Sequence, residues 1–134
     1  GTFQVFNISQ NTRIGHYLQS YKYFTLIESK IRQMFKFKTH IHKAATTYLE
    51  SLGQQKKIGI HIRAFEQNYL KQPHLDYYLE SMSYFKTKMI KPIVFVVTGD
   101  QIKPWKSKLN FTNVYFSNQN NSPQLDMAIL SLCD

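Results

Sequence analysis

The stretch KKIGIHIRAFEQNYL, residues 56–70, places an arginine where an apolar run ends. The guanidinium of Arg63 carries its donors in a planar fork, which matches phosphate oxygens through paired hydrogen bonds. Arg63 is therefore a candidate for binding a phosphorylated ligand. An ion pair with Glu66 or Asp100 is the structural alternative, and these residues alone leave both open.

Two other ionisable side chains, His61 and Asp126, share this ambiguity. His61 alternates with Ile60 and Ile62, so the sequence predicts that it points away from both. It then either orients a loop from the core or contacts a ligand. Asp126 lies one turn inside the last apolar segment, where it either faces solvent or accepts hydrogen bonds from a base edge or a sugar hydroxyl.

Motifs that indicate other chemistry are absent from the sequence. His40 and His42 are two positions apart, so on a helix they do not share a face, and no cysteine pair completes a zinc site. Neither a glycine-rich dinucleotide loop, nor a P-loop, nor a Gly-x-Ser-x-Gly elbow occurs. We expect neither a metal nor a cofactor. A helix N-terminus at Ser122 is a candidate for holding a phosphate.

The second half of the chain alternates between strand and helix patterns. Continuous apolar or β-branched runs predict strands, and three- and four-residue spacing predicts helices. The predicted elements are strands at 57–62, 93–97 and 114–116, a helix at 73–89, a short helix that carries Trp105, and a last helix that follows Ser122 and has Pro123 at its first position. Such alternation predicts a parallel sheet with right-handed crossovers.

A ligand of such a sheet binds beyond the carboxyl ends of the strands. That edge would bring His61, Arg63 and Glu66 next to residues 98–100, which follow the second predicted strand.

The first half of the chain predicts helices. The predicted elements are a loop at 1–12 and helices at 17–37 and 39–52. Aromatic residues recur with helical spacing in the first of these helices and are expected to form its buried face. Gly53 is the expected left-handed cap of the second. The sequence therefore divides into a helical part, residues 1–56, and an α/β part, residues 57–134.

The chain has 134 residues and a net charge of +9, from 17 Lys and Arg against 8 Asp and Glu. This surplus favours anionic partners or reflects a solvated basic surface. No apolar run approaches the roughly 20 residues that cross a bilayer. Cys133 is the single cysteine, and sequons at Asn7, Asn110 and Asn120 favour a secreted or lumenal protein.

Three stretches together resemble the α-1,2-fucosyltransferases and their nematode and bacterial relatives. They are GHYLQSYKYF (15–24), IGIHIR (58–63) and SPQLDMAILSLCD (122–134). The second is similar to the opening of that family's His-x-Arg-Arg-x-Asp motif, and the third to its Ser-Pro-x-x-Asp-hydrophobic-Ser-x-Cys-Asp segment. LDYYLESM (75–82) matches the intervening helix, and the likeness covers most of residues 15–134.

The resemblance implies an α/β enzyme of GT-B-like fold, with residues 1–56 on the acceptor side and residues 57–134 beginning a Rossmann-like donor domain. It implies inverting, metal-independent transfer of fucose from GDP-fucose to a terminal galactose of a glycan. By this likeness Arg63 contacts the β-phosphate, His61 contacts the donor or organises its loop, and Asp126 binds guanine. Arg63 would stabilise the charge that grows on GDP as fucose leaves.

The resemblance also implies a Golgi membrane protein that faces the lumen through a single type II anchor. The missing initiator Met and the final apolar run indicate an excerpt from a longer protein, so we expect the anchor to lie outside it. The expected partners are GDP-fucose and a galactose-terminated glycan, and not nucleic acid.

The chain departs from the family motif directly after Arg63. Where the family has Arg-Arg-x-Asp, this sequence has Arg63-Ala64-Phe65-Glu66, so Ala64 replaces the second arginine and Glu66 keeps the carboxylate. Losing one phosphate donor can cost about 2–3 kcal/mol in catalysis. Arg63 and Glu66 are the candidate catalytic residues of a slower enzyme, or the chain is an inactive relative that binds a GDP-sugar or a glycan. A basic nucleic-acid-binding module is the third alternative.

Overall fold

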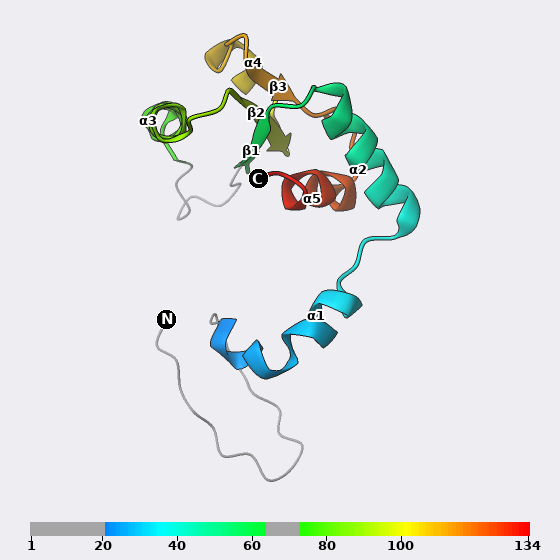
Figure 1. Cartoon of the computed structure of the whole chain (residues 1–134). Coiled ribbons are helices and arrows are strands. Elements are labelled where there is room, and N and C mark those ends of the chain that lie inside the picture. Colours follow the sequence, from blue (N-terminus) through cyan, green and yellow to red (C-terminus); the bar gives the residue numbers. More distant parts are fainter. Residues whose placement is uncertain (1–20, 64–72) are drawn as a thin grey trace. The chain divides into compact units, whose positions relative to one another are not determined.

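The computed structural model describes residues 21–63 and 73–134 (Figure 1). The chain divides into two units, Gly1–Lys36 and Phe37–Asp134. Each unit is defined by its own internal contacts.

The described part of the first unit is a series of short helical turns. The 3-10 helices η1 (Tyr21–Tyr23) and η2 (Thr25–Ile27) lead into α1 (Glu28–Met34), and none of their residues is buried. The prediction of one helix with a buried aromatic face is therefore wrong for this part, and residues 17–20 lie outside the described residues. An apolar stripe on so short a helix needs a packed partner for stability, and the described residues of this unit provide none.

The second unit alternates strands and helices as the sequence predicts. Its elements are α2 (Thr39–Ser51), β1 (Lys56–Ile62), α3 (Leu75–Lys88), β2 (Ile93–Gly99), α4 (Trp105–Lys108), β3 (Val114–Phe116) and α5 (Pro123–Ser131). Gly53 follows α2 with φ of +90°, which confirms the predicted left-handed cap. Ser122 caps α5 by accepting a hydrogen bond from the Leu125 amide, and Pro123 opens the helix as predicted.

The three strands form a parallel sheet in the order β1-β2-β3. All residues of β2 except Gly99 are buried, as expected for a central parallel strand. Gly99 has φ of +137°, and a Cβ there would collide with the backbone oxygen of Ile62. Glycine is therefore required where the ends of β1 and β2 approach one another.

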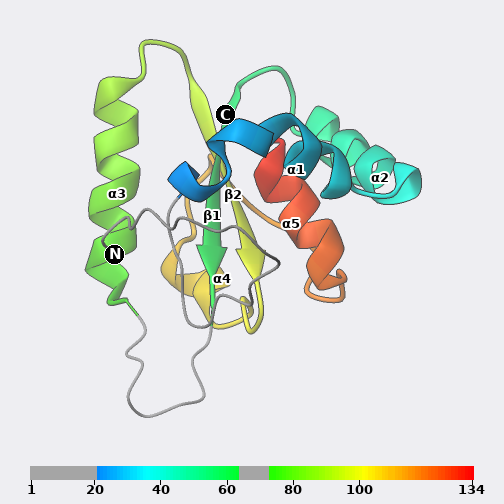
Figure 2. The ribbon, with the colours of Figure 1, turned by 90° about the horizontal axis from the view of Figure 1, so that it is seen from below.

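Helices cover both faces of this sheet, as Figure 2 shows for α3 on one side and α2 with α5 on the other. The core on the α3 and α4 side is the larger; its buried members are Ile58, Ile62, Tyr78, Met82, Ile93, Phe95, Val97, Ile102, Trp105 and Leu109. The core on the other side joins α2, β2 and α5; its buried members are Ala45, Leu49, Val96, Ala128 and Ile129. The arrangement is a mixed α/β unit compatible with a Rossmann-like fold.

The unit boundary differs from the one predicted between residues 56 and 57. Ala45 and Leu49 of α2 pack against Ala128 and Ile129 of α5, so α2 belongs to the same compact unit as the sheet. Packing between segments far apart in sequence decides this boundary, and the change in local pattern after Gly53 does not mark it.

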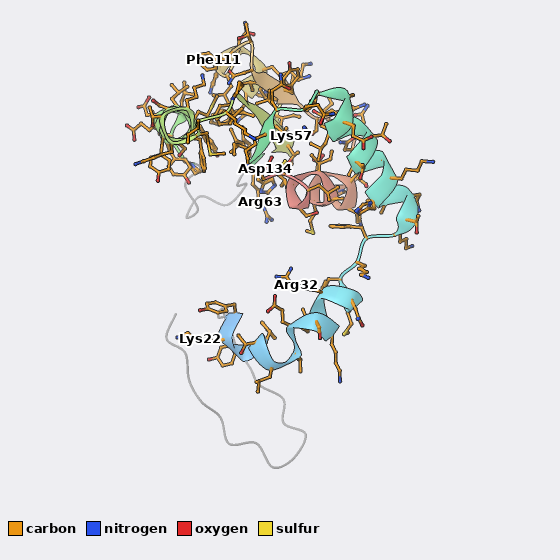
Figure 3. All side chains as sticks on the ribbon, viewed as in Figure 1. Lys22, Arg32, Lys57, Arg63, Phe111 and Asp134 are labelled. Atoms are coloured by element: carbon orange, nitrogen blue, oxygen red, sulfur yellow. The ribbon has the colours of Figure 1, made fainter. Side chains whose placement is uncertain are left out.

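The last residue of the chain returns to the beginning of β1 (Figure 3). The Asp134 amide donates to the backbone oxygen of Lys57 at 2.8 Å, and Oδ2 of Asp134 accepts from the Lys57 amide at 2.9 Å. Nζ of Lys56 adds a hydrogen bond to Oδ1 at 3.2 Å. Hydrogen bonding from the Lys57 amide is the main cause that lowers the pKa of Asp134 below its ordinary value.

Candidate functional site

Arg63 directly follows β1 at the carboxyl edge of the sheet (Figure 3). The side chain is exposed, so its guanidinium can reach a ligand from solvent. The parallel register sets Ile62 opposite Gly99, which brings the ends of β1 and β2 together. The predicted meeting of these two strand ends at one edge is therefore confirmed.

His61 lies opposite Thr98 in the same register. Ile58 and Ile62 of β1 pack in the core with α3, and His61 points to the other face of the strand. Its side chain is exposed, so the alternative of a histidine in the core is wrong. An exposed imidazole next to the carboxyl edge is accessible to a ligand.

Asp126 is positioned in the first turn of α5, and it binds groups from both neighbouring strand ends. Its Oδ2 accepts a hydrogen bond from the Gly99 amide at 3.3 Å, beyond the core of β2. Its Oδ1 accepts from the Ser117 hydroxyl at 3.2 Å, directly after β3, and from the Asn121 side-chain amide at 3.0 Å. The alternative that Asp126 simply faces solvent is therefore wrong.

These three hydrogen bonds limit what Asp126 can do for a ligand. A carboxylate has about four acceptor positions, so three internal donors leave about one for another molecule. The side chain thus ties α5 to β2 and β3 and retains a small capacity to accept a hydrogen bond. The position of Asp126 in the first turn of α5 also favours a negative charge, because the helix dipole is positive there.

Ser117 and Asn121 are the residues of this edge that the sequence did not single out. Ser117 is almost fully buried, although it begins the polar loop SNQNNS. Ser117 could have been identified from its position directly after the predicted strand at 114–116. Arg63 and Asp100 occupy the same position after their own strands. Nothing local in the sequence predicts that Asn121 reaches Asp126.

Two hydroxyls on the α2 and α5 side of the sheet are buried and have no hydrogen-bond partner among the described residues. They belong to Thr98 at the end of β2 and to Tyr48 on α2. Burial, and then the charges of Cys133 and Asp126, raise the pKa of Tyr48 above its ordinary value. Tyr48 is therefore a neutral phenol, and both groups can donate a hydrogen bond.

A cavity of about 210 Å³ opens between β1 and α3. Its lining includes His61, Tyr77 and Ser81, but neither Arg63 nor Asp126. The cavity therefore adjoins the carboxyl edge at His61 and lies mainly on the α3 side, away from the carboxylate of Asp126. The hydrogen-bonded edge is a better candidate for a ligand site than this cavity, because parallel sheets bind ligands at that edge.

Some predicted features fall outside the described residues. Glu66, with Ala64 and Phe65, lies in the segment 64–72, so the structure gives no position for the second candidate catalytic residue. The stretch at 15–24 is described from Tyr21 only. Within residues 21–63 and 73–134, no group of three His, Cys, Asp or Glu side chains is arranged to hold a metal ion. Among the same residues, every helix is too short or too polar to span a bilayer.

Comparison of the chain with models of known protein families, with curated proteins and with solved structures finds no match.

Proposed function

We propose that the α/β unit binds the nucleotide of a GDP-sugar at the carboxyl edge of its sheet, as the donor part of a GT-B-like fucosyltransferase. The observation that carries this proposal is the position of Arg63. It directly follows β1, is exposed, and lies at the strand ends where parallel sheets bind ligands. The resemblance of residues 58–63 and 122–134 to α-1,2-fucosyltransferases supplies the donor, GDP-fucose.

The chemistry assigned to Arg63 is charge stabilisation at the leaving group. Breaking the bond between fucose and the β-phosphate oxygen leaves negative charge on GDP, while the galactose hydroxyl attacks from the opposite face and inverts the anomeric carbon. A fixed guanidinium interacts more strongly with that developing charge than with the bound donor, so it accelerates the transfer. Glu66 is the proposed base for the attacking hydroxyl.

His61 and Asp126 are assigned to holding the donor. The exposed imidazole of His61 is a candidate contact for the donor phosphates or sugar. Asp126 is proposed to bind guanine with the acceptor capacity that its three internal hydrogen bonds leave. Those internal bonds would fix the carboxylate in place before the base arrives, which lowers the entropic cost of binding.

Direct assay tests the enzymatic proposal. The full-length protein is incubated with GDP-fucose and a β-galactoside, and both fucosyl transfer and release of free GDP are measured. The expected result is metal-independent transfer that Arg63→Ala abolishes and Arg32→Ala preserves. Arg32 is the matched control because its side chain pairs with Glu28 on the surface of α1. If the wild-type protein shows no fucosyl transfer and no hydrolysis of GDP-fucose, the enzymatic proposal is refuted.

A second candidate function is binding of a GDP-sugar or glycan without turnover, and Ala64 is the observation that favours it. Here GDP-fucose binds to the wild-type protein but is not consumed. Ala64→Arg would restore the second phosphate donor of the family motif and produce turnover. Turnover in the wild type that Ala64→Arg leaves unchanged would exclude this candidate.

A further inference from the structure

The connection between α4 and β3 carries one of the three N-glycosylation sequons, Asn110-Phe111-Thr112. The Phe111 amide donates to the backbone oxygen of Leu109 at 3.0 Å, so Asn110 is the central residue of a three-residue turn. The Val114 amide then donates to the backbone oxygen of Phe111 at 3.1 Å, and the chain enters β3. The sequon therefore occupies a tight connection between two elements.

Both reactive positions of this sequon are accessible. All three of its residues are exposed, and the side chains of Asn110 and Thr112 form no hydrogen bond with the part of the chain that the structure describes. N-glycosylation needs these two groups: the carboxamide of the asparagine receives the sugar, and the hydroxyl two residues later completes the recognition motif. The sequon at Asn7 lies outside the described residues.

The sequon at Asn120 is held differently. Its second residue, Asn121, donates to Oδ1 of Asp126 at 3.0 Å, and the hydroxyl of its third residue, Ser122, caps the first turn of α5. Pro123 follows directly and restricts the backbone of Ser122. Two of the three residues of this sequon are therefore committed to the structure at the beginning of α5.

The two sequons also lie at opposite ends of β3. Asn110 precedes the amino end of this strand, whereas Asn120 follows its carboxyl end, where Asp126 joins α5 to the sheet. Figure 3 shows Phe111 well apart from Arg63, which follows β1 at the carboxyl edge. A glycan at Asn110 would leave the carboxyl edge open, and a glycan at Asn120 would stand beside it.

We propose that Asn110 is an N-glycosylation site and that Asn120 is not. The sugar donor is an oligosaccharide carried on a lipid diphosphate, and the catalyst is the oligosaccharyltransferase of the secretory pathway. Nδ2 of Asn110 bonds to the anomeric carbon of the first sugar, and the bond from that carbon to the diphosphate oxygen breaks. The lipid diphosphate leaves, and the amide proton goes to a base of the transferase. The proposal rests on the lumenal localisation that the resemblance implies, but not on nucleotide binding at the carboxyl edge.

Mass spectrometry of the full-length protein, expressed in a cell line with a secretory pathway, tests this residue by residue. Peptide-N-glycosidase converts each glycosylated asparagine to aspartate, and in isotopically heavy water the new carboxylate carries a label. We expect the label at Asn110 and none at Asn120. An unlabelled Asn110, or labelling of Asn120 to the same extent, would overturn the proposal.

Matched variants test the same site by electrophoretic mobility. Asn110→Gln and Thr112→Ala each destroy the sequon and should each lose one glycan. Thr112→Ser keeps the hydroxyl and should keep the glycan, and Asn120→Gln should migrate as the wild type does. Unchanged mobility of Asn110→Gln would contradict the proposal.

The altered side chains are exposed, so the variants should fold, and circular dichroism checks this. GDP binding measured in parallel reports on the carboxyl edge alone. Loss of GDP binding therefore refutes the nucleotide proposal without affecting the glycan result, and an unmodified Asn110 does the reverse.

Discussion

Gly99 and Asp126 connect the end of the central strand to the beginning of the last helix. The Gly99 amide donates to Oδ2 of Asp126 at 3.3 Å, at the strand edge where Arg63 follows β1. Since Oδ1 of the same carboxylate binds Ser117 and Asn121, one side chain fixes the geometry of this edge. Both the arrangement and the ligand assigned to it can be tested by substitution.

Asp126→Ala should lower the free energy of unfolding by about 2–3 kcal/mol, because three donors lose a charged acceptor in a half-buried place. Urea unfolding followed by Trp105 fluorescence measures it. Asp76→Ala is the matched control: Asp76 also lies in the first turn of a helix, α3, but it is exposed. The control should lose less than about 1 kcal/mol. If both variants lose a similar free energy of unfolding, the interaction with the helix dipole alone accounts for the stabilisation by Asp126.

Gly99→Ala should destabilise the unit by about 3 kcal/mol or more, because a Cβ collides with the backbone oxygen of Ile62 at a φ unsuited to alanine. Gly59→Ala is the comparison. Its Cβ would approach Cδ2 of Leu130 at 2.9 Å, and the end of a leucine side chain can move. We expect a loss of about 1 kcal/mol there. If the two variants have the same urea midpoint, the close approach of β1 and β2 is not as described.

Thr98→Val should raise the free energy of unfolding by about 1 kcal/mol. The substitution keeps the shape of a fully buried side chain and removes a hydroxyl that has no partner among the described residues. The reverse exchange at the neighbouring buried position, Val97→Thr, should be destabilising by about 1–3 kcal/mol. A destabilised Thr98→Val would mean that the hydroxyl is hydrogen-bonded in solution.

Cys133 should react slowly with iodoacetamide at neutral pH. Burial, followed by the negative charge of Asp134, raises the pKa of its thiol, while Lys57 lowers it less. Since the thiolate is the nucleophile, a raised pKa shifts the rise of the alkylation rate to higher pH. The same chain in urea is the control, and its rate should rise near pH of about 8.5. Equal midpoints in the folded and unfolded chain would contradict the half-buried position of Cys133.

The α/β architecture could be predicted from local sequence because each signal acts within one element. The β-branched and aromatic run Ile93–Val97 is typical of a strand buried on both faces, and Gly53, Ser122 and Pro123 mark helix ends through backbone geometry. Once the alternation of strands and helices is set, parallel pairing brings the ends of β1 and β2 together. The placement of His61 and Arg63 at that edge follows from the same argument.

The remaining features depend on contacts between distant segments, which periodicity does not encode. The hydrogen bonds of Asp126 to Gly99 and Ser117 cross 27 and 9 residues of sequence. The place of α2 in the sheet unit depends on its packing against α5. The aromatic residues at helical spacing in the predicted helix 17–37 indicated a buried face. Such spacing does not specify which segment packs against that face, and the described turns at 21–34 bury no residue.

Calorimetric titration of GDP into the full-length protein and its Arg63→Ala and Arg32→Ala variants is the most direct test of the proposed nucleotide binding at the carboxyl edge. Loss of a charged hydrogen-bond donor to phosphate should weaken GDP binding by about 1.5–3 kcal/mol, or roughly 10- to 150-fold, in Arg63→Ala. Arg32→Ala should bind as the wild type does. Equal affinity of Arg63→Ala and wild type, or no GDP binding by the wild type, would contradict the assignment of this edge to a GDP-sugar.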